Sequence, residues 1–392
     1  MKRQNFKFLS KERIPIENRR FVTGKGNYVA DINRPNMLHV AILPCHEPSA
    51  IIKNIDFSKS LKIKGVVDVV TGNELVNAIN PLINGLDTPN VKRFPLAIDR
   101  VRYAGEWICA VAAETRAIAE DAMELINIEI VKQDFVLDAE QALLSESPNV
   151  HPEHGSNILL QKKFVWGEVE KHFDKSDHNL TYSVKWGRNS TVPIETFGVV
   201  AEWNYVENIL DIWASIQMPK FSDMIANVLG INGNDVRVHY DVDVGGSYGV
   251  KRGIKHTILA SYLSRKLNRP IKLIEDRLEN MRAGDAHGPE RKFDVSLAFN
   301  NDGSINSMKM RALDNAGAYA GRAPFQLGKP IGAIVGPYKI LSVSYEAISV
   351  TTNKAVQEAV RGFGQAPTNY ALETGVDKIA KYLKIDKLEL RK

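Results

Sequence analysis

Cysteine is scarce in this chain of 392 residues, which contains only Cys45 and Cys109. Neither belongs to a C-x-x-C pair, so the chain supplies no zinc or iron–sulfur ligand set of its own. Two cysteines can form one disulfide, but a chain of this length gains little from a single bridge. We therefore expect two buried, reduced thiols, as is usual for a cytoplasmic protein.

Long apolar runs are also missing. No run reaches the ~20 residues that a membrane-spanning helix needs, and the segment Met1–Arg20 is polar and lacks the apolar core of a signal peptide. Arg19-Arg20 superficially resembles a twin-arginine signal, but the sequence that follows, FVTGKGNYVADI, is typical of strand and turn. We expect neither a targeting segment nor a membrane span.

Charge of one sign does not form a block interleaved with aromatic residues. The net charge is +5, from 51 basic and 46 acidic residues whose signs are interspersed. A protein that binds nucleic acid usually gathers its positive charge on one face or in one tail. We therefore do not expect this chain to bind nucleic acid.

Several familiar catalytic patterns are absent as well. The sequence contains no S-x-x-K motif of the serine acyltransferases. His151 and His154 lie in a loop-like segment and do not form the helical H-E-x-x-H pattern of zinc enzymes. Cys45 and His46 are neighbours on a predicted strand, where adjacent side chains point to opposite faces and cannot form a thiolate pair.

The succession of helix and strand patterns predicts an α/β (α+β) fold. The chain is 44% hydrophobic and 25% charged, which is ordinary for a globular protein. Composition divides it into an N-terminal extension over residues 1–20, a first α/β unit over 21–145, a linker rich in Pro, Ser, His and Asn over 146–160, and a second α/β region over 161–392.

Both regions alternate strand and helix patterns. In the first we expect strands at Met37–Leu43, Ile51–Phe57, Gly65–Thr71, within Val101–Glu114 and at Ile126–Val131, and helices from Thr71 and over Thr115–Leu125. In the second we expect strands over Ala201–Ser215, Val236–Val244, Phe293–Asn300 and Met308–Ala320, and helices over Asp223–Gly230, His256–Asn268 and about Pro367–Tyr382. The turn Asn301–Ser304 indicates a hairpin.

The segment Asp241–Arg252, DVDVGGSYGVKR, directly follows a predicted strand. Paired glycines let a backbone approach a bulky ligand closely and expose N–H groups to anions. The spacing is neither the G-x-G-x-x-G of a dinucleotide-binding fold nor the phosphate loop that ends in G-K-[ST]. An ordinary turn after a strand is the alternative.

Three other segments offer polar groups. Arg361 stands among small residues before a predicted helix, where it presents a guanidinium to an anion or is simply a surface arginine. Gln217 follows a predicted strand and offers an amide donor and acceptor to a ligand, or only closes a turn. Glu195 precedes an apolar strand, where capping of backbone N–H groups fits better than a role in a site.

Seven segments, taken in order, are similar to segments of one known family, although no single segment is sufficient to show this. They are FVTGKGNYVADI, RYAGEWICAVAAET, SIQMP, DVGGSYGVK, LIEDRLE, DNAGAYAG and VRGFGQAPTNYALE. Together they resemble the large subunit of the molybdenum hydroxylases, the family of xanthine dehydrogenase, aldehyde oxidase and aerobic carbon monoxide dehydrogenase. The resemblance extends from about Arg20 to Lys392 and matches the N-terminal half of that subunit. It implies an α/β hammerhead domain over 21–145 and the first part of a molybdopterin-binding domain over 161–392.

The resemblance also implies a reaction and its cofactors. The family oxidises an aldehyde or an N-heterocycle with water-derived oxygen at a molybdenum-molybdopterin cofactor, and electrons leave through [2Fe-2S] clusters and FAD on partner subunits. By resemblance, Arg361 contacts the substrate and Arg252 and Phe363 lie on the substrate side. The residues implied on the cofactor side are Gln217, Gly245, Gly246, Ser247, Tyr248 and Gly249, and none of these binds the metal directly.

Some residues depart from the family pattern. Ser247 and Tyr248 replace a common glycine and phenylalanine, and Arg252 stands where xanthine-type enzymes hold a purine through a glutamate, which disfavours a purine substrate. The segment around Arg361 also lacks the cysteine loop of carbon monoxide dehydrogenases. The family's large subunit is about twice as long, and its later half supplies much of the pterin site and the general-base glutamate.

We therefore expect this chain to be inactive alone. It would need the C-terminal half of the large subunit, an iron–sulfur small subunit and an FAD medium subunit, all in the cytoplasm. The alternative is a non-catalytic truncated fragment that only binds partner subunits. A cofactor-insertion chaperone fits less well, because such a protein would not need the segment around Arg361.

Overall fold

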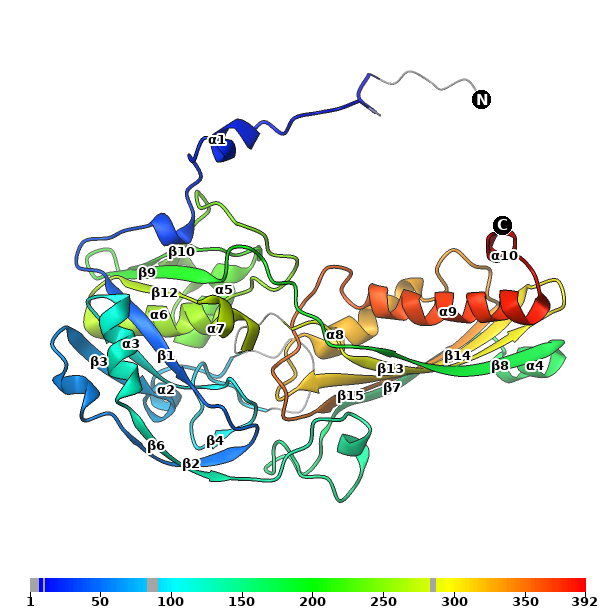
Figure 1. The fold of residues 1–392 in the computed structure, drawn as a ribbon, viewed down its shortest axis with the longest axis horizontal. Coiled ribbons are helices and arrows are strands. Elements are labelled where there is room, and N and C mark those ends of the chain that lie inside the picture. The colour runs from blue at the N-terminus through cyan, green and yellow to red at the C-terminus, as the bar shows by residue number, and fades with distance from the viewer. Residues whose placement is uncertain (1–6, 10, 83–90, 283–286) are drawn as a thin grey trace.

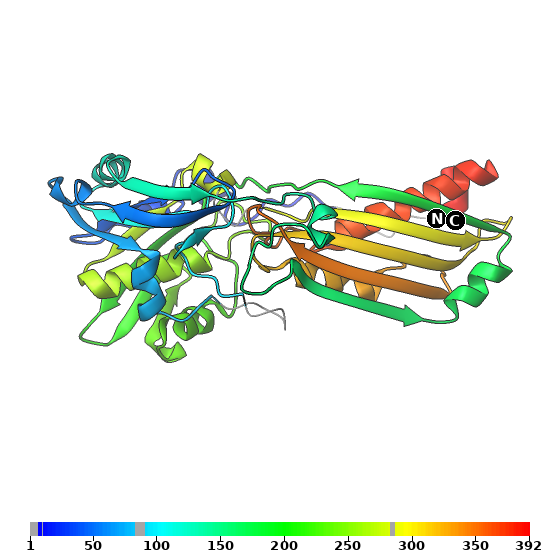
Figure 2. The same cartoon turned by 90° about the horizontal axis from the view of Figure 1, so that it is seen from below.

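A computed structural model describes residues 7–9, 11–82, 91–282 and 287–392. Of the predicted N-terminal extension, residues 1–20, positions 1–6 and 10 lie outside the described residues. The molecule is elongated, with a lobe of mixed helices and strands at one end and a long sheet at the other (Figures 1 and 2). The predicted α/β (α+β) class is confirmed.

One lobe is built on a seven-stranded sheet with the order β11-β10-β9-β12-β1-β5-β3. Its strands are β1 Leu38–Pro44, β3 Val66–Thr71, β5 Trp107–Ala113, β9 Gly198–Asn204, β10 Ile209–Ala214, β11 Val236–His239 and β12 Ile271–Ile274. A small sheet, β4-β2-β6, consists of β2 Ala50–Asp56, β4 Arg100–Val101 and β6 Asn127–Lys132. The helices of this lobe are α2 Gly72–Ala78, α3 Arg116–Glu124, α5 Phe221–Leu229, α6 Ile254–Leu267 and α7 Arg277–Arg282.

The other lobe is built on a five-stranded sheet with the order β7-β15-β14-β13-β8. Its strands are β7 Ile158–Trp166, β8 His178–Trp186, β13 Arg291–Phe299, β14 Ile305–Gly317 and β15 Ser342–Thr351, and its helices are α4 Val169–Lys175, α8 Ala323–Gly328, α9 Gln365–Leu383 and α10 Lys387–Arg391. Helix α1, Asn18–Val22, stands outside both lobes (Figure 1). Short 3-10 helices lie at Val29–Asp31, Ser60–Lys62, Gln141–Leu143, Gly233–Asp235 and Lys329–Ala333.

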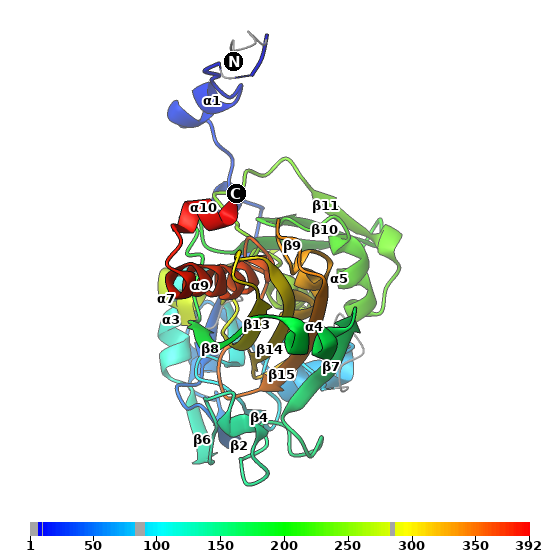
Figure 3. The ribbon, with the colours of Figure 1, turned by 90° about the vertical axis from the view of Figure 1, so that its right-hand side faces the viewer.

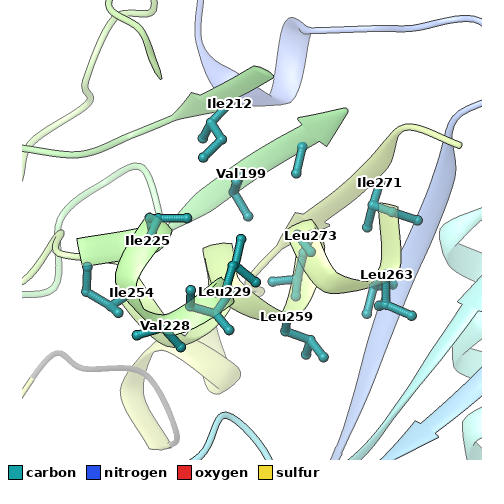
Figure 4. Packing of buried hydrophobic residues seen from close by; sticks show 14 of the residues in the cluster. Val199, Ile212, Ile225, Val228, Leu229, Ile254, Leu259, Leu263, Ile271 and Leu273 are labelled. Atoms are coloured by element: carbon teal, nitrogen blue, oxygen red, sulfur yellow. The ribbon is translucent and has the colours of Figure 1, made fainter. Parts of the chain in front are cut away.

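The seven-stranded sheet joins the two predicted α/β regions. Strand β1 of the first region pairs in parallel with β12 of the second, where Leu38 faces Ile271. Helices α5 and α6 pack on this sheet, and Val199, Leu259 and Leu273 are among the buried side chains between them (Figure 4). Because both regions contribute to one apolar core, neither can bury its share of the sheet without the other.

Elements with strong local signals form where they were predicted. The turn Asn301–Ser304 connects β13 and β14 as an antiparallel hairpin, and Gly303 adopts φ +86° there. The hydroxyl of Thr115 accepts the Ile118 N–H at 3.2 Å and caps α3. The last long helix, predicted over about Pro367–Tyr382, is α9.

The strand predicted over Val236–Val244 is wrong beyond His239, where β11 ends. The residues that follow do not continue the sheet, because Asp243 accepts hydrogen bonds from outside it. Its carboxylate receives the Asn27 N–H at 2.7 Å and the Arg20 guanidinium at 2.5 and 2.7 Å. These bonds direct the chain away from the strand and toward residues 245–249, which contain three glycines.

The two cysteines are free and buried, which confirms the expectation of reduced thiols. Burial raises the pKa of the Cys109 thiol to about 12, so its reactive thiolate form is strongly disfavoured. Among the described residues, no helix combines the length and apolarity required to cross a bilayer.

The predicted linker, residues 146–160, contains a buried histidine that ties the two lobes together. The Nδ1 atom of His151 accepts from Arg102 Nε at 3.1 Å, so its Nε2 carries the hydrogen and donates to the Ala318 carbonyl at 2.6 Å. Close by, the Tyr319 hydroxyl donates to buried Glu106 at 2.7 Å. Arg102 and Glu106 belong to the first predicted region and Ala318 and Tyr319 to the second.

We expect this histidine to make the fold sensitive to acid. Burial, with the nearby Arg102 charge, lowers the pKa of His151 to about 4 from an ordinary 6.5. Between these values the unfolded chain binds a proton that the native chain excludes, so stability is complete above pH 6.5 and falls as the pH drops toward 4. The expected loss is up to about 3 kcal/mol.

Urea unfolding of the wild type and the non-titrating variant His151→Gln at pH 7.5, 6 and 5 measures this effect. The free energy of unfolding should fall with pH more steeply in the wild type than in the variant. His154→Gln, at an exposed histidine three positions along the chain, serves as the control and should follow the wild type. Equal slopes in the wild type and His151→Gln would show that His151 is not the acid-sensitive group.

Candidate functional site

The predicted cofactor-side residues converge where β10 ends. Gln217 lies three residues beyond β10, and its side-chain Oε1 accepts both the Ser247 hydroxyl and the Gly249 N–H, the latter at 3.2 Å. The Gln217 N–H donates to the Lys251 carbonyl at 3.2 Å. The amide of Gln217 therefore holds the glycine loop, residues 245–249, in its observed shape.

The glycine loop also contacts the segment that carries Arg361. The Arg361 N–H donates to the Tyr248 carbonyl at 2.7 Å, and the Arg361 guanidinium lies 5.6 Å from the centre of the Tyr248 ring. Gly249 adopts φ +112°, and a Cβ there would lie 2.5 Å from the Ala359 carbonyl oxygen. Only glycine permits this close approach of two backbone segments about 110 residues apart in the sequence.

A partly buried ion pair supports the glycine loop. Glu195 Oε2 accepts the Gly245 N–H at 2.7 Å, and the Glu195 N–H donates back to the Gly245 carbonyl at 3.2 Å. Lys251 Nζ lies 2.5 Å from the same carboxylate oxygen, and burial lowers the pKa of Lys251 although Glu195 opposes the shift. The predicted capping role of Glu195 is confirmed, whereas Lys251 had no distinguishing signal in the sequence.

Arg252 is engaged by a carboxylate of the chain itself. Its guanidinium pairs with Glu358 at 2.9 Å, and both side chains are largely buried. The Glu358 carbonyl accepts the Gln326 amide at 2.8 Å, and burial together with the Arg252 charge lowers the pKa of nearby Arg322. The positive charge of Arg252 is thus compensated within the chain, and its place on the substrate side stays a prediction.

The turn that carries Arg361 is built from residues with left-handed backbone. Gly362, Phe363 and Gly364 adopt φ of +97°, +42° and +87° before α9 begins at Gln365. A Cβ on Gly364 would lie 1.8 Å from the Gln326 carbonyl oxygen, so the turn is packed tightly against α8. Phe363 is half-buried in this turn, next to Arg361.

Residues 245–249 also match the G-x-S-x-G pattern of serine hydrolases. That pattern works when the serine hydroxyl is hydrogen-bonded to a histidine base. Here the Ser247 hydroxyl donates to Gln217 and accepts the Lys251 N–H at 3.3 Å. Ser247 is therefore a structural residue of the loop rather than an activated nucleophile.

The site presents hydrogen-bond donors that have no acceptor among the described residues. The backbone N–H groups of Gly246, Ser247 and Tyr248 make no hydrogen bond within this part of the chain, and neither does the exposed Arg361 guanidinium. Successive N–H groups in a glycine-rich turn beside an arginine favour an anionic ligand. The donor set therefore fits a cofactor that carries negative charge.

The surface around these donors is open and partly apolar. Gln217, Tyr248 and Arg361 are exposed, and Ile194 next to the glycine loop is 95% exposed. The described residues contain no group of three or more His, Cys, Asp or Glu side chains arranged to hold a metal ion.

Two family models match the chain. The molybdopterin cofactor-binding domain matches residues 150–392, and the a/b hammerhead domain of aldehyde oxidase and xanthine dehydrogenase matches residues 23–134. The 6-hydroxypseudooxynicotine dehydrogenase complex subunit gamma of Paenarthrobacter nicotinovorans is 30% identical over 98% of this chain and 49% of its own length. The chain spans about half the length of several curated relatives that it matches.

The chain is also similar to a solved structure and to a subunit of nearly its own length. The crystal structure of quinoline 2-oxidoreductase from Pseudomonas putida 86 superposes with a TM-score of 0.89 at 32% identity, over 96% of this chain and 48% of that chain. The nicotinate dehydrogenase large molybdopterin subunit of Eubacterium barkeri is 25% identical, and here the match covers 99% of this chain and 89% of the relative. A subunit of similar length thus exists among the relatives.

Proposed function

Because the chain belongs to the molybdopterin cofactor-binding family that includes the aldehyde oxidases and xanthine dehydrogenases, we propose that it forms one part of a molybdenum-dependent hydroxylase. The proposed enzyme oxidises an aldehyde or an N-heterocycle with oxygen derived from water. Its active site is shared with a second polypeptide that corresponds to the C-terminal half of the longer relatives. An iron–sulfur subunit and an FAD subunit receive the electrons.

The observation that carries this proposal is the meeting of Gln217, the glycine loop and Arg361 in one open site. The free N–H groups of Gly246, Ser247 and Tyr248 would hold the negatively charged cofactor, and Gln217 keeps them in place. When bound, a molybdenum-molybdopterin cofactor supplies transfer of a water-derived oxygen to the substrate carbon and takes up two electrons.

Arg361 would act on the substrate rather than on the cofactor. Negative charge develops on the substrate oxygen during attack, and a cation fixed beside it stabilises that charge more than it stabilises the resting substrate. The Arg361 N–H donates to the Tyr248 carbonyl, which fixes the Arg361 backbone before the turn of Gly362 and Gly364. The Arg361 guanidinium lies over the Tyr248 ring. No residue of this chain is proposed as the general base, which the second polypeptide would supply.

The ion pair of Arg252 and Glu358 limits the class of substrate that the proposed site can bind. Glu358 is neutralised by Arg252 at 2.9 Å, so it is not available to bind the ring nitrogens of a purine. The names of two relatives contain the N-heterocycles nicotinate and quinoline, which supports a simple N-heterocycle as substrate. The non-catalytic alternative, a fragment that only binds other subunits, would leave the donors of the site without a ligand.

The test is the activity of the complete complex, purified through a tag on this chain. We expect turnover per molybdenum to be higher with benzaldehyde, quinoline or nicotinate than with xanthine, and we expect the isolated chain to be inactive and without stoichiometric molybdenum. Product formed in ¹⁸O-labelled water should carry the label. Faster turnover of xanthine would refute the substrate class, and a complex without molybdenum would favour the non-catalytic alternative.

A further inference from the structure

The N-terminal arm, defined here as residues 7–9 and 11–26, projects from the lobe that holds the seven-stranded sheet and contacts it at its base through Arg20 (Figures 1 and 3). Its short helix α1 buries none of its residues. Ile14 is 81% and Ile16 100% exposed, and Val22 is 82% exposed. A run of large apolar side chains without cover on a folded chain indicates a surface that another molecule covers.

The arm also carries the positive charge of the molecule. Residues 7–9 and 11–26 contain six Lys or Arg and two Glu, a net charge of +4, whereas the whole chain has a net charge of only +5. Most of the excess positive charge therefore lies in the arm, and the rest of the chain, where the two signs are interspersed, is close to neutral. An apolar arm with this charge is complementary to an acidic surface that offers apolar pockets.

The base of the arm is fixed to Asp243, just before the glycine loop. Arg20 forms a bidentate ion pair with Asp243 at 2.5 and 2.7 Å, and the Asn27 N–H donates to the same carboxylate at 2.7 Å. Asp243 stands two residues before Gly245. The arm therefore begins next to the candidate site, and whatever binds the arm lies beside the glycine loop.

The exposed apolar groups of the site continue this surface. Val244, Tyr248 and Ile194 are exposed around the glycine loop. Figures 1 and 3 show the arm and the C-terminal helices α9 and α10 on the same side of the molecule. We propose that the arm is a docking element for the second polypeptide that completes the molybdopterin site, and that it binds an acidic surface with apolar pockets on that polypeptide.

This inference rests on the proposed function, since it names how the second polypeptide is held. A second copy of this chain is a poorer occupant, because the rest of the chain is nearly neutral and does not complement the arm. A membrane surface is also a poorer occupant, because the ion pair of Arg20 and Asp243 places the arm beside the donors of the site rather than on a separate face.

In the experiment, the complex is purified through a tag at Lys392 from the cells that make this chain. The second polypeptide is then identified by mass spectrometry from its molybdopterin-domain sequence. Ile14→Asp with Ile16→Asp removes the apolar contacts of the arm, and Lys11→Glu with Arg13→Glu reverses its charge. We expect each double variant to lower recovery of the second polypeptide by about tenfold or more. Recovery with the wild type should also fall at high salt.

Val206→Asp is the matched control. Val206 is 97% exposed, like Ile16, but it lies in the turn between β9 and β10, at the far end of β10 from Gln217. This variant should recover the second polypeptide as the wild type does. Thermal unfolding should give every variant the melting temperature of the wild type. This result would show that the arm substitutions do not act by destabilising the fold.

The outcomes separate the two proposals. If the wild type recovers no molybdopterin-domain polypeptide, the proposed function and the arm inference both fail. If the wild type and both arm variants recover it equally, the arm inference fails while the proposed function stands. Two other outcomes would overturn the inference, each with unchanged recovery of the second polypeptide. If the isolated arm variants lose self-association, the arm binds a second copy of this chain. If they lose binding to phosphatidylserine vesicles, the arm binds a membrane.

Discussion

Arg361→Met in the complete complex is expected to lower turnover by about 10²–10³, the usual cost of removing one donor that stabilises developing charge, while the molybdenum content stays unchanged. The guanidinium lies over the Tyr248 ring and forms no ion pair with the described residues. Its neighbours Gly362 and Phe363 carry no donor side chain, so nothing replaces it. The Arg361 N–H, which holds the Tyr248 carbonyl, remains in the variant.

Steady-state kinetics and metal analysis of the same preparation measure this prediction. Arg361→Lys keeps the charge and should recover part of the lost rate, since lysine supplies a point charge without the planar fork. Arg237→Met, at a half-exposed arginine of β11, is the control for loss of a surface cation and should keep the full rate. If Arg361→Met loses its molybdenum, Arg361 is a cofactor-site residue; if it keeps the full rate, Arg361 is an ordinary turn residue.

Gly249→Val is expected to abolish molybdenum binding in the complete complex and with it all activity. A side chain at φ +112° is strained, and its Cβ would lie 2.5 Å from the Ala359 carbonyl oxygen, which belongs to the backbone and cannot rotate away. The glycine loop must then separate from the segment of Arg361. The free N–H groups of Gly246, Ser247 and Tyr248 would no longer face one ligand.

Gly155→Val separates this local effect from the general cost of a side chain at positive φ. Gly155 adopts φ +74°, and a Cβ there meets no atom within 4 Å. This variant should retain molybdenum and activity. Gln217→Ala, which removes the acceptor of the Ser247 hydroxyl and the Gly249 N–H, should reduce molybdenum occupancy less severely than Gly249→Val. Full molybdenum in Gly249→Val would show that the contact of the two loops is not needed for the cofactor.

The parts of the fold that could be predicted are those with local causes. The turn at Gly303 requires left-handed backbone, Thr115 caps α3 through its own hydroxyl, and α9 follows from its apolar spacing. Each signal lies within a few residues of the element that it specifies. The order of seven short segments likewise sufficed to indicate the family, although no segment did so alone.

The parts that could not be predicted depend on residues far apart in the sequence. Parallel pairing of β1 with β12 joins positions more than 200 residues apart, and no pattern in either strand specifies its neighbour. The strand β7 was not predicted, because its exposed residues do not alternate between apolar and polar. The same holds for the site, where Glu358 neutralises Arg252 and Lys251 supports Glu195 only through the fold.

The most direct test of this account is the molybdenum content of the complete complex that carries the wild-type chain, Arg361→Met or Gly249→Val, measured side by side and normalised to the second polypeptide. We expect about equal molybdenum in the wild type and Arg361→Met and almost none in Gly249→Val, with Gly155→Val like the wild type. Equal molybdenum in all four complexes, with activity retained in Gly249→Val, would contradict the claim that the glycine loop of this chain holds the cofactor.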